Sequence, residues 1–523
     1  MNHSKIKIAP ILTIAAIALL ASMGSFAHPS QASAQSAAQP THSPATPLPL
    51  SGRPGNSGSV TAIEAPIAGT TNSVTTINPS VQVQGPYTGS ASSTAKLPFT
   101  GKLSLRDAVQ RGLNFNLGAA NLNRAVAQAQ GQGEIARSAL LPNISGYLAE
   151  NLAQTNLAAE GFRVHIPIPG FTFPTIVGPY NNIDLRGSVT QSIVDLTAWN
   201  NFRASSEQVR AAQLTARDAR DAVVLAVCGE YLQIIATTQR VASAHAQLDT
   251  ATALLQQTQQ KRAVGLSPQI DVDRSEVEQL TQQQRVISLE TELAKQKIGL
   301  ARITGLPPND AYELSDDVPF AAAPTFTLDD AIHQALDRRS DIKAAEAQIR
   351  AAQRALAGAH DERLPSLSIN GNYGTIGTNP AQASATFSAA ATLSVPIWQG
   401  GRTEGDIKQA QAALAQRQSE LEDLKGQVES DVRNAFLDLQ AATSQVKLAQ
   451  RNLQVNQETL DLSRQRFDAG VTDNVEVVQA QESLTSANLD VINSVFAHNV
   501  AKLSLARAIA SAADNLQQFL SLQ

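Results

Sequence analysis

Two very long stretches of the chain carry apolar residues at helical spacing. The first runs from about Trp199 to Val264 and the second from about Gly401 to Ala469. At a helical rise of about 1.5 Å per residue, each predicts a helix roughly 100 Å long. A pattern of this length without internal capping residues is typical of coiled-coil packing and not of a compact domain.

Each long stretch ends at a short break, and another helical pattern follows. Gly is the usual residue just past a helix end, because it adopts a left-handed backbone without a Cβ clash. The hydroxyl residue two positions later stands at the N-cap of the next helix, and Pro268 follows it in the first-turn position. The break residues are Gly265, Leu266 and Ser267 in the first case and Gly470, Val471 and Thr472 in the second. The pattern predicts two helical hairpins with tight tips.

The same unit occurs twice along the chain. Adding 205 to a position in the first hairpin gives its counterpart in the second, so that Tyr231 corresponds to Phe436. Upstream of the long helices the offset is 223, and Leu105 corresponds to Leu328. The difference, 223 − 205 = 18, marks an insertion in the first half. A period this long indicates one duplication and not a solenoid.

Ahead of each long helix, the apolar spacing switches from helical to alternating. A helical pattern runs from Ser104 to about Leu141 and stops at Pro142, and its counterpart runs from Thr327 to Pro365. The alternating segments that follow span about 143–156, 183–193, 367–373 and 385–395. Strands that alternate apolar and polar side chains are typical of a membrane β-barrel. A soluble antiparallel sheet packed on the helices is the alternative.

These patterns predict a mainly α chain with four membrane β-strands, built from a duplicated unit. The insertion, at about 158–180, contains four prolines and is expected to be an irregular loop. The expected order is a signal peptide (1–27), a disordered Ser-, Pro-, Thr- and Ala-rich extension (28–100), a first repeat (101–305), a linker (306–325), a second repeat (326–510) and a C-terminal tail (511–523).

The first residues have the pattern of a secretory signal. Lys5 and Lys7 precede an apolar run from Ile8 to about Met23, and small residues at Ser25 and Ala27 suit a signal peptidase. An uncleaved anchor helix is the alternative. A secreted chain of this pattern is expected to work in the cell envelope.

Composition narrows the picture further. Aromatic residues make up only 4% of the chain, which suits helices packed through small side chains, and the net charge of −5 predicts no nucleic-acid partner. The single cysteine, Cys228, lies mid-helix beside apolar residues and is expected to pack in the core. The two tryptophans, Trp199 and Trp398, both fall where a strand gives way to a long helix. An interfacial aromatic belt lies at such junctions, although an ordinary packing role is the alternative for each.

Strand counting predicts an assembly. Four strands are too few to close a barrel, and open edges cannot face lipid because their backbone groups would lack hydrogen bonds. Two chains would give a barrel nearly filled by its own side chains, whereas three would leave a pore. We therefore expect a homotrimer with a 12-stranded β-barrel, continued by an α-helical barrel made of the long hairpins.

The duplicated helix–Pro–strand–strand–long helix–tip–helix unit resembles the TolC-like outer membrane factor (outer membrane efflux protein) family. The resemblance covers about Leu103 to Ala510 and includes both tips. It implies a trimeric outer membrane channel with a large periplasmic extension. Such a channel is the exit duct of a tripartite efflux pump or a type I secretion system, and passes small molecules or polypeptides outward. The implied partners are outer membrane lipid, a periplasmic adaptor protein at the tips, and an inner membrane transporter.

The resemblance also implies site residues. The adaptor-contact residues would be Gly265, Leu266 and Ser267 with Gly470, Val471 and Thr472. Carboxylates six and nine residues past the tip Gly line the closed periplasmic entrance in the family. Asp271 and Glu476 match the first position, whereas Gln479 replaces the second. Threefold symmetry would turn each carboxylate into a cation-attracting ring. Alternatively, Asp271 and Glu476 are first-turn acids that favour the helix dipole.

Two rival functions remain from the sequence. An enzyme would need a motif that is not found: no His pair at metal-ligand spacing, no phosphate loop and no nucleophile elbow occurs. We expect no catalysis, no metal and no cofactor. A periplasmic coiled-coil adaptor or scaffold is the second rival, since it would share the long hairpins but would not need the amphipathic strands.

Overall fold

A computed structural model of the 523-residue chain describes residues 60–67, 76–91, 101–159, 161, 174–307, 311–322, 327–472 and 474–520. The predicted signal segment, 1–27, lies outside the described residues, as do residues 162–173 of the predicted inserted loop.

Helices dominate the described residues. They are α1 (Leu105–Phe115), α2 (Leu117–Ser138), α3 (Leu196–Ala263), α4 (Gln269–Thr304), α5 (Leu328–Arg338), α6 (Ser340–Asp361), α7 (Arg402–Asp468), α8 (Asn474–Ala508) and the short α9 (Leu516–Phe519). Both predicted long helices are present, because α3 has 68 residues and α7 has 67.

The duplication is visible in the bounds of the helices. Adding 223 to the bounds of α1 and α2 gives those of α5 and α6. Adding 205 to the bounds of α3 gives 401–468, against the observed 402–468 of α7. The two repeats therefore fold into the same elements in the same order.

The short helices of each repeat are broken, whereas the sequence predicts one continuous helix. α1 and α2 are separated by Asn116, and α5 and α6 by Arg339, and both residues have an extended ψ near 130°. The buried amide of Asn116 accepts a hydrogen bond from the Gly118 N–H (2.9 Å) and donates one to the Tyr87 carbonyl (2.8 Å). Tertiary contacts thus stabilise a break that the continuous apolar spacing does not reveal.

Four strands form one antiparallel sheet in the order β4-β5-β7-β8. They are β4 (Asn143–Asn156), β5 (Ile176–Val194), β7 (Ser366–Gly377) and β8 (Ser384–Ser394), with the 3-10 helix η2 (Pro380–Gln382) between the last two. All four predicted strands are present. The prediction of an irregular loop up to residue 180 is wrong at its end, because β5 already begins at Ile176, where it pairs with Asn156.

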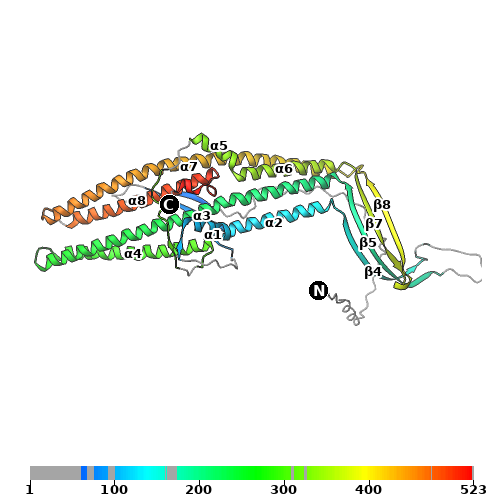
Figure 1. Cartoon of the computed structure of the whole chain (residues 1–523), viewed down its shortest axis with the longest axis horizontal. Coiled ribbons are helices and arrows are strands. Elements are labelled where there is room, and N and C mark those ends of the chain that lie inside the picture. Colours follow the sequence, from blue (N-terminus) through cyan, green and yellow to red (C-terminus); the bar gives the residue numbers. More distant parts are fainter. Residues whose placement is uncertain are drawn as a thin grey trace, which may run out of the picture. The chain divides into compact units, whose positions relative to one another are not determined.

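The helices lie side by side in rows (Figure 1). On the side of the sheet the order is α2, α3, α6 and α7, and toward the hairpin tips it is α4, α3, α8 and α7. Helices α2 and α4 therefore lie at one side of the helical rows and α7 at the other. This order leaves a flank of α4 and a flank of α7 without a neighbouring helix in the described protein.

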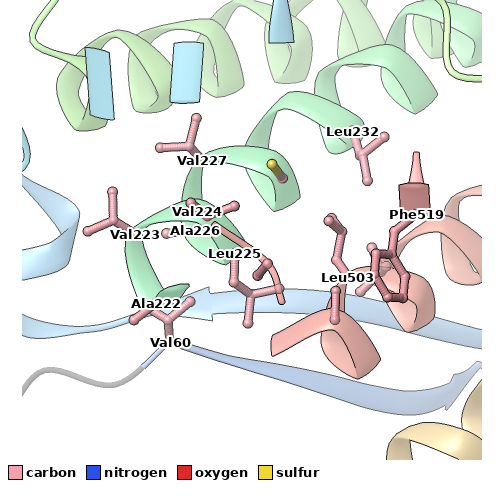
Figure 2. Close-up of a cluster of buried hydrophobic side chains, with 14 of the residues drawn as sticks. Val60, Ala222, Val223, Val224, Leu225, Ala226, Val227, Leu232, Leu503 and Phe519 are labelled. Carbon is pink, nitrogen blue, oxygen red and sulfur yellow. The ribbon is translucent and has the colours of Figure 1, made fainter. Parts of the chain in front are cut away.

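The core surrounds the middle of α3. Residues Ala222 to Cys228 are buried on every side of the helix, and Val60, Leu503 and Phe519 pack against them (Figure 2). One 18-residue window of α3 is long and apolar enough to cross a membrane by composition, but 72% of that window is buried inside the protein, as in a core helix. The packing role predicted for Cys228 is confirmed, and burial raises the pKa of its thiol well above the usual range.

Part of the extension expected to be disordered is folded. Residues 60–67 and 76–83 form a hairpin of strands β1 (Val60–Ile67) and β2 (Thr76–Val83), followed by the 3-10 helix η1 (Gly85–Thr88). The hairpin contacts α3 and α8. It can approach α3 closely because Gly229 has no side chain: a Cβ there would lie 2.5 Å from Cγ2 of Val81. The alternating Val-Gln-Val-Gln at 81–84 is a sequence signal of strand β2.

The linker and the C-terminal tail are also packed structure. Within the linker, β6 (Glu313–Leu314) pairs in parallel with β3 (Lys102–Leu103), and the Tyr312 hydroxyl donates to the Lys297 carbonyl (2.6 Å). In the tail, Phe519 and Leu520 are buried in the core. These segments are too short for a periodic pattern, so only their contacts reveal that they are folded.

The ends of α4 and α8 generate a prediction about stability. Gly305 and Ala510 occupy equivalent left-handed positions, with φ of 71° and 55°, and Ala510 is the one non-Gly residue with positive φ among the described residues. We expect Ala510→Gly to raise the free energy of unfolding by about 0.5–1 kcal/mol, because it removes the left-handed Cβ strain. Thermal unfolding in detergent measures this change.

The matched variant is Gly305→Ala, which should destabilise the protein. Its Cβ would lie 2.8 Å from Cβ of Phe115, in addition to the backbone strain. A lower unfolding temperature for Ala510→Gly than for the wild type would contradict the assigned strain.

Candidate functional site

The two hairpin tips have the same backbone geometry. At the first tip the Gly265 N–H donates to the Arg262 carbonyl (2.9 Å) and the Leu266 N–H donates to the Lys261 carbonyl (2.8 Å). The second tip repeats both bonds, from Gly470 and Val471 to the Phe467 and Arg466 carbonyls, at 3.1 Å and 3.0 Å. These paired bonds form the Schellman motif, and they require the left-handed φ of 77° and 73° that the two glycines have.

The tips present apolar side chains to solvent. Val264, Leu266 and Val471 are 70%, 79% and 69% exposed. A Cβ added at Gly265 or Gly470 would meet no atom within 4 Å. Each tip is therefore a rigid turn with an open, partly apolar surface, which is suited to contact with another protein.

The two hairpins touch near their tips through a contact that the sequence did not reveal. The ammonium group of Lys261, at the end of α3, lies 3.7 Å from the ring centroid of Phe467, at the end of α7. A cation over an aromatic ring is attracted by the ring's negative face. The contact joins residues more than two hundred positions apart, and no local pattern could predict it.

Asp271 and Glu476 have matching local environments. Each carboxylate lies in the first turn of its helix and accepts a hydrogen bond from the tip hydroxyl four residues earlier, Ser267 for Asp271 (3.0 Å) and Thr472 for Glu476. The predicted N-cap at Ser267 is wrong, because Pro268 is the N-cap of α4 and Ser267 is bonded to Asp271 instead.

The second carboxylate is held more firmly than the first. Glu476 also accepts hydrogen bonds from Arg466 (2.9 Å) and Ser463 (3.4 Å), whereas the closest cation to Asp271 is Arg274, at 3.9 Å. Gln479 lies on the exposed side of α8 about one turn beyond Glu476. The first-turn positions agree with the helix-dipole interpretation, and they leave the gate role as a hypothesis.

The four-stranded sheet has an apolar face that is exposed to solvent in the single chain. The register of the pairs places most of the large apolar residues of the four strands on this face, together with Glu150, whereas Tyr147 and Ile376 lie on the opposite face. The apolar residues on this face are Ile144, Leu148, Leu152, Ile183, Leu185, Val189, Leu367, Ile369, Tyr373, Phe387 and Leu393. Phe387 is 77% exposed and Ile144 is 81% exposed. A face of this kind needs an apolar environment.

The opposite face of the sheet is polar. Hydroxyl and amide side chains of neighbouring strands bond to each other across it, as between Ser145 and Ser188 (2.7 Å) and from Asn372 to Ser388 (2.7 Å). Asp184 and Arg186 form an ion pair on the same face. The alternation predicted from the sequence is thus confirmed, with one face suited to lipid and the other to water.

The edges of the sheet are β4 and β8, and neither has a further strand beside it among the described residues. Each edge carries a row of backbone N–H and C=O groups that can pair with another strand. The apolar face and the two open edges thus leave a hydrophobic surface and rows of hydrogen-bonding groups without partners in the part of the chain that the structure describes.

The sequence analysis did not predict a buried polar cluster on α8, which contains His498 and Lys502. His498 is fully buried with its ring centroid 4.7 Å from that of Phe320 in the linker, and Lys502 donates to the Ala321 carbonyl (2.9 Å). Burial, aided by the nearby Lys502, lowers the pKa of His498 to about 4, and burial lowers the pKa of Lys502 to about 8. The equivalent of His498 in the first repeat is Leu293, so the departure from the repeat was a signal in the sequence.

No group of three or more His, Cys, Asp or Glu side chains that could hold a metal ion occurs in the part of the chain that the structure describes. Long hairpins with exposed tips, joined to a sheet with one apolar and one polar face, define the class of TolC-like outer membrane factors.

Comparison with known proteins supports this class. The chain belongs to the outer membrane efflux protein family, whose model matches residues 109–306 and 331–511. It is 24% identical over 328 residues to the outer membrane protein TolC of Vibrio cholerae, covering 61% of this chain and 75% of the relative. It is 23% identical over 430 residues to the pyoverdine export outer membrane protein OpmQ of Pseudomonas aeruginosa, covering 78% and 85%. The protein is therefore an outer membrane protein.

Solved structures share the fold. The Campylobacter jejuni CmeC outer membrane channel matches with a TM-score of 0.69 at 16% identity, covering 82% of this chain and 92% of that chain. CusC matches with a TM-score of 0.66 at 15% identity, covering 79% and 95%.

The buried His498 generates a prediction about pH. Its pKa is lower in the folded chain than its ordinary value of about 6.5, so the unfolded chain binds the proton more tightly. Protonation of His498 therefore does not affect the free energy of unfolding above pH 6.5, and it lowers this free energy as the pH falls toward 4. We expect His498→Leu to be more stable than the wild type by about 2 kcal/mol at pH 4.5 and similar to it at pH 7.5.

Comparing the two proteins at each pH cancels the other titrating groups, among them Asp221, whose pKa burial raises to about 6. Unfolding curves in denaturant measure the difference. An equal difference between wild type and His498→Leu at both pH values would show that the imidazole does not titrate as expected.

Proposed function

We propose that the protein is the outer membrane channel of a tripartite efflux pump and works as a homotrimer. The observation that carries this proposal is the sheet, which has an exposed apolar face, a polar face and two open edges. In lipid, unpaired backbone groups at such edges cost several kcal/mol each, so the sheet must close on copies of itself. Three copies make 12 strands and a water-filled pore lined by the polar face.

The helical rows also support closure of the barrel by copies of the chain. Two flanks without a neighbouring helix, one on α4 and one on α7, each carry exposed apolar residues. They are Ile270, Val277, Leu280 and Ile287 on α4, and Leu437, Leu448, Val455 and Leu462 on α7. On α7, residues 448, 455 and 462 repeat at the heptad spacing of a coiled-coil seam. Pairing α4 of one copy with α7 of the next buries both flanks and continues the barrel as a helical tube.

The hairpin tips are the proposed docking surface for a periplasmic adaptor protein. Gly265, Leu266 and Ser267 form one contact and Gly470, Val471 and Thr472 the other. The adaptor links the channel to an inner membrane transporter, which selects the cargo. Small molecules are the proposed cargo, because one relative is named as a pyoverdine export outer membrane protein (OpmQ) and another as a cation efflux system protein (CusC).

The membrane sheet also separates this proposal from the periplasmic scaffold. A scaffold would keep the long hairpins but would have no use for an exposed apolar face on four strands. This protein shares the outer membrane location of its family, which does not favour the periplasmic scaffold as its function.

The assembly is tested by measuring mass in detergent and conductance in planar bilayers, with one matched pair of variants. Val455→Glu adds one carboxylate to the apolar flank of α7, and Gln457→Glu adds one to an exposed position nearby. We expect a trimer with small, mostly closed conductance for the wild type and for Gln457→Glu. Val455→Glu should dissociate, because burying an unpaired charge at the interface costs several kcal/mol. A wild-type monomer without conductance would overturn the proposal.

The carboxylates near the tips are the proposed charged rings at the periplasmic entrance. We expect Asp271→Asn and Glu476→Gln each to lower the ratio of cation to anion permeability roughly twofold or more, because each removes one ring of three charges. Gln479→Glu should raise this ratio. Single-channel recordings with unequal salt measure it.

Arg466→Gln is the control for the gate hypothesis. It breaks the ion pair with Glu476 and keeps the carboxylate. If Glu476→Gln leaves selectivity and cation block unchanged, or if Arg466→Gln has the same effect as Glu476→Gln, the carboxylate is a helix-stabilising residue and not part of a gate.

A further inference from the structure

Strands β1 and β2 lie on one face of the helical rows. Within the rows, α3 has α2 or α4 on one side and α6 or α8 on the other, so that two faces of α3 remain. Val81 of β2 packs where Gly229 has no side chain, and Val60 of β1 lies beside Ala222 (Figure 2). Ala222 and Gly229 are seven residues apart and therefore share one face of α3.

Helix α1 and strand β3 cover the opposite face of α3. A Cβ at Gly112 of α1 would lie 2.5 Å from Cγ2 of Val227. The Tyr231 hydroxyl donates to the Leu103 carbonyl of β3 (2.9 Å). Val227 and Tyr231 are each two residues from Gly229, which is a rotation of about 200° around the helix. The β1–β2 hairpin and α1 thus lie on opposite faces of the helical rows.

The second repeat has only one of these two layers. α5 packs on α7 as α1 packs on α3, and Val432, the equivalent of Val227, is fully buried. Asn434, the equivalent of Gly229, is exposed. The face that carries α1 and α5 is therefore covered in both repeats, whereas the hairpin covers the other face in the first repeat alone.

The hairpin is fixed to the helices at its C-terminal end. Residues 85–91 lead from β2 to the break between α1 and α2. There the Leu117 N–H donates to the Gly89 carbonyl (2.9 Å) and the Ala91 N–H donates to the Phe115 carbonyl (2.6 Å). Backbone bonds on both sides of the break satisfy groups that the helix ends leave free, so this segment belongs to the wall of helices.

The size of the proposed tube decides which face is the inner one. Twelve helices about 10 Å apart form a ring with a bore roughly 28 Å across. Three copies of α1 and α5 are six helices, and side by side they need about 60 Å. The layer just inside the bore has a circumference of about 57 Å, so these helices would fill it completely. An open bore therefore requires α1 and α5 on the outside, which places the hairpin on the inside.

We propose that strands β1 and β2 lie on the inner wall of the duct and form a constriction at the level of the middle of α3. A pair of strands is about 10 Å wide and packs about 10 Å from the helices, so three hairpins occupy roughly half of the inner layer. This inference rests on the proposed trimeric channel, and it adds a second level, distant from the tips, at which the duct limits the size of its cargo.

The described side chains that face the duct are polar and uncharged. Thr61 and Gln82 stand opposite each other in the register, and both are exposed. Val60 and Val81, one position earlier on each strand, pack on the helices, as the alternation of a strand requires. Such a surface offers hydrogen bonds without a charge. The hairpins therefore restrict cargo by size, whereas the proposed carboxylates near the tips act by charge.

Distances between copies test the position of the hairpin. The single cysteine, Cys228, is fully buried, so a nitroxide reagent reacts only at an introduced cysteine. Gln82→Cys labels the hairpin. Ser315→Cys is the matched control on the opposite face, where the Ser315 N–H donates to the Leu103 carbonyl (3.1 Å). Both positions are exposed. Pulsed electron paramagnetic resonance of the full chain in detergent measures the distances between equivalent labels.

We expect distances shorter than about 25 Å for Gln82→Cys and longer than about 45 Å for Ser315→Cys, because the labels lie inside and outside a ring of helices of about 19 Å radius. Equal distances or the reverse order would overturn the proposal, since the hairpin would then not lie in the bore. If neither variant gives a distance between copies, the protein is not a trimer and the proposed function fails as well.

Single-channel recordings test whether the hairpins restrict passage. The quantity measured is the amplitude of the brief openings, because open tips do not limit the current. We expect the label on Gln82→Cys to lower this amplitude roughly twofold and the label on Ser315→Cys to leave it unchanged. Short distances between the Gln82→Cys labels with an unchanged amplitude would overturn the constriction and leave the channel function intact.

Discussion

Backbone hydrogen bonding at the two edges of the sheet constrains the whole molecule. β4 and β8 each end the sheet with a row of unpaired N–H and C=O groups. In water these groups would be solvated, but the apolar face beside them belongs in lipid, where no such solvation exists. The chain therefore cannot satisfy its own sheet, and the proposed trimer would supply the missing strands.

The helices, which lie in water, likewise leave surface without a partner in the single chain. α4 and α7 bound the helical rows, and each keeps an apolar flank that no described helix of the same chain covers. The sheet edges and the helix flanks thus lie on the same two sides of the duplicated unit. In the proposed trimer, a contact that closes the strands also brings the two flanks together, so one lateral interface would serve the membrane part and the helical part.

Duplication produces two similar halves, and the positions at which they differ make contacts that occur in only one half. The hairpin β1–β2 packs only where Gly229 gives it room, and the equivalent residue in the second repeat is Asn434. The second repeat instead holds the linker through His498 and Lys502. At the membrane junction, a single residue connects β5 to α3 whereas a seven-residue turn connects β8 to α7. Each departure from the repeat marks a position with its own contacts.

The sequence by itself determined the duplicated hairpins, the two tips and the four amphipathic strands. These features depend on local rules: the periods of helix and strand, the left-handed freedom of Gly265 and Gly470, and the stop at proline. The sites followed only in part, since the tip residues and the positions of Asp271 and Glu476 are local, whereas their bonding partners are not.

Only the tertiary structure decided the breaks at Asn116 and Arg339, the contact between Lys261 and Phe467, and the packing of residues 60–67 and 76–91. Each of these depends on atoms that lie far apart in the chain. The buried amide of Asn116, for example, is satisfied by the Tyr87 carbonyl, and no spacing along the sequence encodes that bond.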